Sequence, residues 1–129
     1  MGQVPVSDQL KRFIWLFIPS VSYLEALLMV RGDAGKWWDY KEIAPRLYLD
    51  DAATQQLLED LRAAGALSAD AQDATLYRYA PRTPELQQMI DQLANVYAHN
   101  LVAVTHLIHS KLNKKAQHFA NAFKWQKDR

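Results

Sequence analysis

Residues 13–30 are the most apolar stretch of the chain, and a run of this length must lie either in a membrane or in a protein core. Pro19 interrupts the run, and Glu25 lies well inside it. A charge near the bilayer centre costs about 2.5–3.5 kcal/mol, and a helix usually ends before a proline. No small-residue cleavage site typical of a signal peptide is present. We therefore expect two consecutive core helices separated at Pro19, and no membrane insertion.

The composition is that of one globular domain. The chain has 129 residues, of which 50% are hydrophobic and 22% are charged, and a domain of this size buries roughly 65–70% of its unfolded surface. It contains no cysteine, which excludes disulfides, thiolate nucleophiles and cysteine-ligated metals and favours a cytoplasmic location. The net charge of +1 argues against a uniformly basic surface.

Capping residues and apolar spacing predict the order of elements. Ser7 opens a helix over 8–18, and Ser20 or Ser22 opens a second one that ends near Gly32. The segments that follow are a short extended piece at 37–38, a helix over 40–47 capped by Asp39, a helix over 51–64 capped by Asp50 and ended by Gly65, and a hairpin of strands 66–68 and 75–80. Thr83 and Pro84 then open a last helix, with no proline or glycine after it.

The last helix repeats apolar residues at alternating spacings of three and four. This spacing is typical of a coiled-coil-like seam, either against the same domain or against a second copy of the chain. We divide the chain into residues 1–83 and residues 84–129, the second part being a dimerisation helix with a basic tail. The predicted dimer interface consists of Leu86, Ile90, Leu93, Tyr97, Leu101, Val104 and Ile108.

Residues 49–67 resemble a segment of a known family. The segment begins with small or polar residues and continues with the pair Leu57–Leu58, then Leu61, and Gly65 followed by Leu67. This pattern is similar to the recognition helix and first wing strand of bacterial winged helix-turn-helix regulators of the MarR and PadR type. Residues 76–81 resemble the second wing strand of these proteins, and 83–110 resemble their dimerisation helix. The fold implied is mainly α with a small β-hairpin wing (α+β), a winged helix-turn-helix followed by a long C-terminal helix.

The resemblance also implies a function. It predicts a homodimeric transcriptional regulator that places the helix over 51–64 in the major groove of double-stranded DNA and the wing over 66–80 near the flanking backbone. The residues facing the groove would be Ala52, Gln55, Gln56, Glu59 and Arg62. The available phosphate contacts are Lys36, Lys41, Arg46, Arg78 and Arg82. An amide such as that of Gln55 can pair with adenine through two hydrogen bonds.

The charge distribution departs from the family pattern. Residues 49–67 have a net charge of −3 where the family usually has Arg or Lys, and residues 111–129 have a net charge of +5. Helix capping and the helix dipole account for Asp50 and Asp51, whereas Glu59 and Asp60 have no such role. A winged-helix module that binds protein without binding DNA is therefore the alternative. The basic tail could contact DNA, the acidic segment of a partner subunit or an anionic membrane, and we expect it to fold back or cross to the partner.

Three further possibilities have simpler structural explanations. The histidines at 99, 106, 109 and 118 could ligate a metal, but packing beside a seam is the favoured interpretation, and we expect no metal or cofactor. Trp37, Trp38, Tyr40 and Tyr48 could line a pocket for an unknown small-molecule effector, but packing against the small sheet is favoured. Glycine-rich phosphate loops, nucleophile elbows and metalloprotease motifs are absent, so we expect no enzyme.

Overall fold

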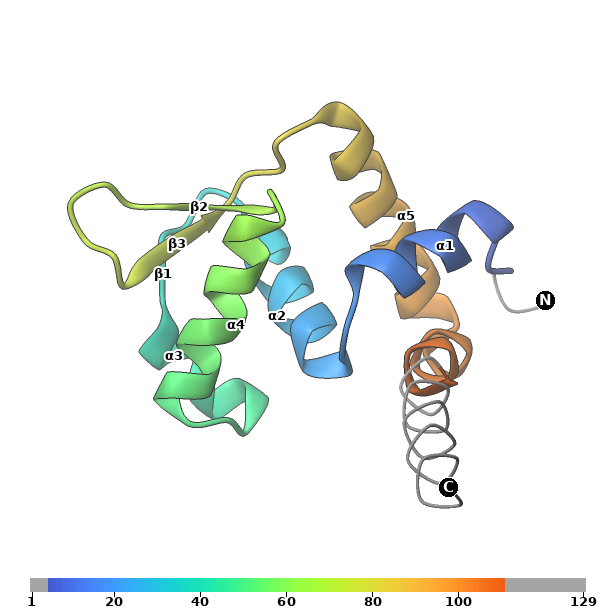
Figure 1. Ribbon diagram of the computed structural model, residues 1–129, viewed down its shortest axis with the longest axis horizontal. Helices are drawn as coiled ribbons and strands as arrows, with labels where there is room; N and C mark the ends of the chain where they lie inside the picture. The colour runs from blue at the N-terminus through green and yellow to red at the C-terminus, as the bar shows by residue number, and fades with distance from the viewer. Residues whose placement is uncertain (1–4, 111–129) are drawn as a thin grey trace, which may run out of the picture.

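The computed structural model describes residues 5–110, so His118 and the basic segment 111–129 lie outside the described residues. The elements are α1 (Asp8–Phe17), α2 (Val21–Gly32), β1 (Trp38–Asp39), α3 (Tyr40–Leu47), α4 (Asp51–Ala63), β2 (Leu67–Ala69), β3 (Leu76–Tyr79) and α5 (Pro84–His99), followed by a helical stretch at Leu101–Ser110. Helix α2 lies in the middle of the fold, with α3, α4 and the hairpin on one side and α1 and α5 on the other (Figure 1).

Side chains at the predicted positions cap the helices. The Oγ of Ser7 accepts a hydrogen bond from the N–H of Leu10 (3.1 Å), and Ser20, not Ser22, caps α2. At α3 the side chain of Asp39 accepts from the backbone while Glu42 accepts from the N–H of Asp39 (3.1 Å), which completes a capping box. Helix boundaries were therefore predictable, because a cap satisfies backbone N–H groups that have no partner inside the helix.

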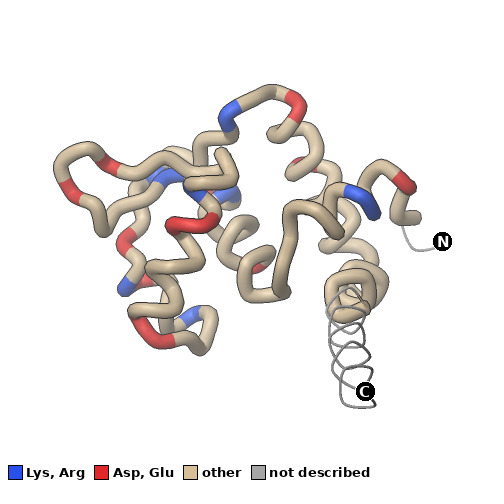
Figure 2. Tube along the Cα trace, in the orientation of Figure 1, with Lys and Arg blue, Asp and Glu red and all other residues tan. Residues whose placement is uncertain are grey.

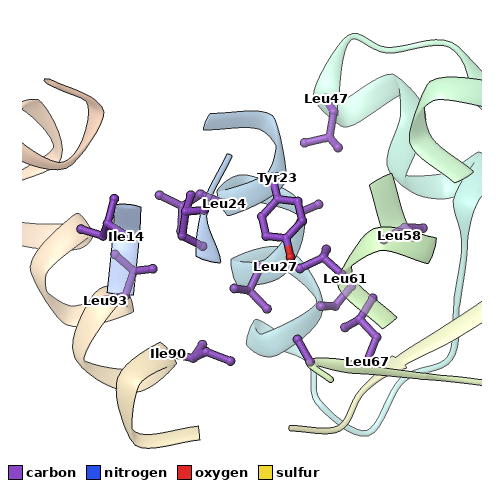
Figure 3. Packing of buried hydrophobic residues seen from close by; sticks show 14 of the residues in the cluster. Ile14, Tyr23, Leu24, Leu27, Leu47, Leu58, Leu61, Leu67, Ile90 and Leu93 are labelled. Carbon is purple, nitrogen blue, oxygen red and sulfur yellow. The ribbon is translucent and has the colours of Figure 1, made fainter. Parts of the chain in front are cut away.

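The apolar run at 13–30 forms α1 and α2 as predicted. The two helices meet at an angle of 104° around Pro19, and Ile14 and Leu24 both point into the core (Figure 3). No single helix among residues 5–110 is long and apolar enough to cross a membrane, and only this bent pair meets the length and composition criteria together.

A single hydrophobic core runs from one side of the fold to the other. Leu58 and Leu61 of α4 are buried beside Leu27 of α2, and Ile90 and Leu93 of α5 close the core on the far side (Figure 3). Leu57 is only partly buried. The apolar face predicted for α4 therefore packs mainly against the core, and the opposite face of the helix is not covered by it.

The hairpin belongs to a three-stranded antiparallel sheet with the strand order β1-β3-β2. Gly65 ends α4 with φ 89°, a left-handed conformation that suits glycine, and its carbonyl accepts a hydrogen bond from the N–H of Arg82 (2.8 Å). Strand β1 pairs Trp38 with Tyr77. The sequence indicated only an extended piece at this point, because a strand of two residues has no periodicity to detect.

The last helix is not continuous, which corrects the sequence prediction. Helix α5 ends at His99, and Asn100 takes φ −151° and ψ 59° before helical residues resume at Leu101. The N–H of Ala103 donates to the Asn100 side chain (3.4 Å), as at a helix start. The break allows Val104 and Ile108 to reach the core. Periodicity alone could not reveal it, because a turn at Asn100 preserves the apolar spacing on both sides.

Tyr48, in the turn between α3 and α4, generates a stability prediction. It adopts a left-handed conformation (φ 56°, ψ 37°), and 95% of its surface is exposed. This conformation costs a residue with a Cβ about 1–2 kcal/mol, and glycine loses about 0.5–1 kcal/mol more backbone entropy on folding. Tyr48→Gly should therefore raise the free energy of unfolding by about 0.5–1 kcal/mol in denaturant titrations. Tyr48→Ala keeps the backbone penalty, so an equal gain in that variant would contradict the explanation.

Candidate nucleic-acid interface

The exposed face of α4 and the hairpin enclose an open groove of about 480 Å³. All five residues predicted to face DNA on this helix line it. The lining comprises Ala52, Gln55, Gln56, Glu59 and Arg62 from α4, and Ala69, Ala74 and Tyr77 from the hairpin. The structure therefore brings together the residues that the sequence placed on one helical face, and adds residues from the wing.

Local structure explains how the groove is built. Residues 52, 55, 56 and 59 follow helical spacing, so they share a face opposite the buried Leu58 and Leu61. Tyr77 is paired with Ala69 and Trp38 in the sheet, and its ring is buried. Tyr77 also lines the groove, and its hydroxyl donates to Glu59 of α4.

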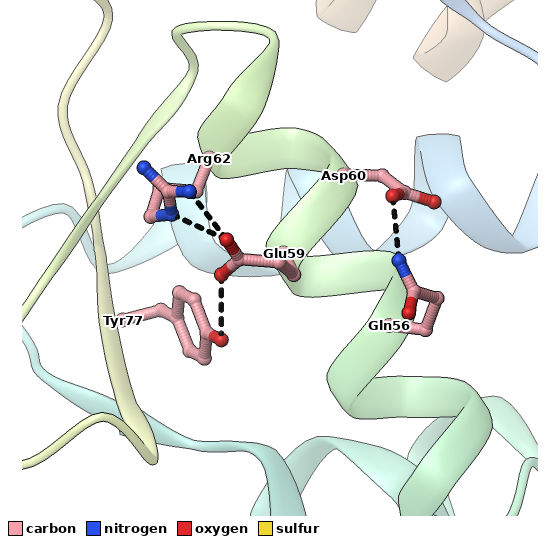
Figure 4. Close-up of polar contacts among 5 residues, drawn as sticks. All are labelled: Gln56, Glu59, Asp60, Arg62 and Tyr77. Atoms are coloured by element: carbon pink, nitrogen blue, oxygen red, sulfur yellow. Dashed lines mark hydrogen bonds and ion pairs between the residues drawn. The ribbon is translucent and has the colours of Figure 1, made fainter.

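The acidic residues of α4 have partners within the site (Figure 4). Oε1 of Glu59 accepts hydrogen bonds from Arg62, through Nε at 2.9 Å and through Nη2, and Oε2 accepts from the hydroxyl of Tyr77 at 3.2 Å. The amide of Gln56 donates to Oδ1 of Asp60 (2.9 Å). Glu59 and Asp60, for which the sequence indicated no role, thus have partners on α4, and Glu59 has a further partner on β3.

These contacts reinforce the ordinary charge states of the groups in the groove. Hydrogen bonding from Arg62 lowers the pKa of Glu59, with a further lowering from Tyr77 and an opposing effect of desolvation. Glu59 in turn raises the pKa of Arg62. Burial, with the nearby charge of Glu59, raises the pKa of Tyr77. At neutral pH the groove therefore holds a carboxylate, a guanidinium that neutralises it, and a protonated phenol.

Three other acidic residues of α4 and the hairpin support local backbone. Asp50 accepts from the N–H of Ala53 (2.7 Å) at the start of α4. In the loop between β2 and β3, Asp70 accepts from Gln72 and Asp73 accepts from Thr75. Figure 2 shows acidic positions at the tip of the hairpin and at the start of α4, the two elements that line the groove.

The predicted phosphate contacts lie elsewhere, around aromatic rings. The Nζ of Lys36 is 4.0 Å from the ring centre of Trp38, and Arg78 is 4.5 Å from that of Trp37. The other three are Arg46, which lies beside Trp38 at 5.5 Å, Lys41, which lies beside Tyr40 at 5.9 Å, and Arg82, which contacts Gly65. None of these five lines the α4 groove. A cation–π contact holds a cation in place without removing its charge, whereas Lys36 is also ion-paired with Glu42 (3.0 Å), which offsets it.

The four aromatic residues considered for an effector pocket lie in different surroundings. Trp38 is buried in the core, Tyr40 packs against the core, and Trp37 lies beside Arg78, whereas Tyr48 is exposed. The packing interpretation therefore holds for Trp37, Trp38 and Tyr40. In the part of the chain described here, histidine and acidic side chains form no group of three or more that could hold a metal ion.

The predicted dimer seam is divided between the core and the surface. Ile90, Leu93, Val104 and Ile108 are fully buried within the protomer, whereas Leu86 and Tyr97 are partly buried and Leu101 is 51% exposed. The buried four therefore have no surface to offer a partner. The spacing correctly indicated apolar burial, but it could not tell an internal core from an interface.

An exposed apolar surface on α1 and residues 101–110 was missed by the sequence prediction. Leu16 of α1 is 83% exposed and Val102 is 70% exposed. Trp15, Leu16 and Leu107 line a groove between α1 and residues 101–110. The signal in the sequence was Leu16 itself, which lies off the face of α1 that carries Leu10 and Ile14.

The arrangement around Glu59 predicts a measurable pKa change. Arg62→Met removes the largest influence that lowers the pKa of Glu59, so this pKa should rise toward its usual value or beyond it in an NMR pH titration. A carboxyl group whose pKa is lower in the native state than in the unfolded state stabilises the fold above its unfolded pKa, and this stabilisation is lost as the pH falls through the native pKa. The variant lacks this stabilisation, so it should also unfold at a higher pH on acidification. Tyr77→Phe should produce a smaller shift, and no shift in either variant would exclude the described contacts.

Comparison with solved structures identifies the fold. A point mutant of MepR from S. aureus superposes with a TM-score of 0.51 and 15% sequence identity over 93% of this chain and 87% of that chain. Another MepR mutant, bound to an oligodeoxyribonucleotide, gives a TM-score of 0.51 and 14% identity over 93% of this chain and 86% of that chain. The sequence matches no protein-family model and no curated protein. At such identities the likeness establishes architecture, and it confirms that this chain has the predicted winged-helix fold, which it shares with these two structures.

Proposed function

We propose that this protein is a homodimeric, cytoplasmic DNA-binding transcriptional regulator without catalytic activity. The observation that carries the proposal is the groove on α4, where the five residues that the sequence assigned to DNA recognition line one surface beside the wing. In a winged-helix fold this helix face enters the major groove. A solved structure of the same fold, a MepR mutant, contains a bound oligodeoxyribonucleotide.

The groove is chemically suited to reading base edges. Among the described residues the amide of Gln55 has no hydrogen-bond partner, so it is free to pair with adenine N6 and N7. Glu59 is neutralised by Arg62, which reduces its repulsion of DNA phosphates. Phosphate attraction would come mainly from the two arginines beside the tryptophans, Arg46 and Arg78, because Lys36 is ion-paired with Glu42.

We place the dimer interface on α1 and residues 101–110. Leu16 and Val102 are exposed, and the groove lined by Trp15 and Leu107 lies between these two helical segments. Large exposed apolar side chains gathered in this way are typical of a surface that another protein covers. The second part of the chain, from residue 84, would then contribute both to the protomer core and to the contact between copies.

A second candidate function is protein binding without DNA binding. The observation in its favour is the acidic rim of the α4 groove, where Asp50 and Asp51 begin the helix and Asp70 and Asp73 occupy the hairpin tip. These residues would repel phosphates and would favour a basic protein surface.

DNA binding by the full chain separates the two candidates. Binding to genomic fragments in fluorescence anisotropy should weaken steeply as salt rises, because neutralised phosphates release counterions. Gln55→Ala should reduce affinity for a selected fragment about tenfold, since a two-bond amide–adenine contact is lost. Gln87→Ala, which removes the same side chain from an exposed position on α5, is the matched control. No binding at low salt would reject the DNA function and leave the protein-binding candidate.

The dimer surface predicts a change in molecular mass. The full chain should elute at about twice 14.8 kDa in size-exclusion chromatography with light scattering, and Leu16→Glu should shift it to the monomer because a charge would be buried at the interface. Tyr48→Glu, at an exposed position far from α1, should leave the dimer intact. A monomeric wild-type chain, or a Leu16→Glu variant that stays dimeric, would contradict the assignment.

A further inference from the structure

Glu59 stands out as an acid in the middle of a surface that is proposed to meet DNA. Its side chain is 42% exposed, it lines the α4 groove, and it is held at both oxygens. Asp60, by contrast, is bonded to Gln56 and does not line the groove. Resting on the proposed function, we propose that Glu59 is a specificity-determining residue that accepts a hydrogen bond from the amino group of cytosine in the major groove.

The carboxylate has acceptor capacity left for a base. An ionised carboxylate offers about four lone-pair sites. Arg62 occupies sites on Oε1 and the hydroxyl of Tyr77 occupies one on Oε2, so a lone-pair site of Oε2 remains for a further donor on a residue that lines the groove. An ionised carboxylate can only accept, and therefore it can pair only with a base edge that donates.

Base chemistry selects cytosine among the four possibilities. In the major groove guanine presents the acceptors N7 and O6, and thymine presents the acceptor O4, so both repel a carboxylate. Adenine donates from N6 but has the acceptor N7 beside it, an arrangement that suits an amide. Cytosine donates from N4 with no neighbouring acceptor on its own edge. Its paired guanine presents two acceptors that the unoccupied N–H groups of Arg62 can meet, so the Glu59–Arg62 pair complements one C·G base pair.

Tyr77 and Arg62 act as positioning residues for this contact. Arg62 offsets the charge of Glu59 and so limits its repulsion of phosphates, while the hydroxyl of Tyr77 ties the carboxylate to the buried centre of the sheet. Because Tyr77 belongs to β3 and Glu59 to α4, this contact also keeps the recognition helix and the wing in one fixed relation. A side chain held at both oxygens loses little further freedom when it binds a base.

Selection of binding sites from a randomised duplex pool, with the full chain, tests the proposal. The wild-type protein should select sites with a conserved C·G pair in each half-site. Glu59→Gln should change the preference at that position toward A·T, because an amide matches adenine. Tyr77→Phe should still prefer the C·G pair. The ratio of its affinity for the C·G site to its affinity for the same site with T·A should fall about threefold, and a general loss of protein stability would not change this ratio. Asp60→Asn should select the same sites as wild type and is the matched control.

The outcomes separate this proposal from the function on which it rests. If Glu59→Gln and Glu59→Ala select the wild-type base with the wild-type affinity ratio, Glu59 does not read DNA, while the DNA-binding function stands. If wild type and every variant select no sequence at low salt, the proposed function fails and this assignment fails with it. Circular dichroism and thermal melting confirm that each variant is folded before its sites are compared.

Discussion

The burial of α2 is the interaction on which the rest of the structure depends. Leu24, Leu27 and Val30 are completely buried, and the helix contacts α3, α4 and β3. Because α2 is apolar on nearly all sides, it must be surrounded, and the elements around it become two groups that share one core. The orientation of α4 follows from this arrangement, since Leu58 and Leu61 pack inward and its polar face is left beside the wing.

Hydrogen bonding by close neighbours holds the acidic side chains of the site, and one of them, Glu59, is also paired with a cation. The sequence shows four acids between residues 49 and 67 and suggests a surface unsuited to DNA. In the structure Glu59 is paired with Arg62, Asp60 accepts from Gln56, and Asp50 caps α4. The number of acids in a segment is therefore an incomplete guide to its partners, because an ion pair within one helical turn, such as Glu59 with Arg62, offsets part of their charge.

Local rules predicted much of the fold. Caps at Ser7, Asp39 and Asp50 marked helix starts, and Gly65 marked the end of α4. These signals are local because capping hydrogen bonds join residues two or three positions apart. The strand pairing of β1 and the helix break at Asn100 were missed. The first depends on a partner far along the chain, and the second leaves the apolar spacing of the surrounding residues unchanged.

The sequence by itself determined which residues share the polar face of α4, because helical geometry places positions three and four apart on one side. It also determined that the last helical region would be apolar along one stripe. Only the tertiary structure decided that Ile90 and Ile108 would fill the protomer core and that Leu16 would be exposed. It alone brought Tyr77 to Glu59, 18 residues away in the chain. Periodicity specifies which side chains avoid water, whereas the folded chain decides which surface covers them.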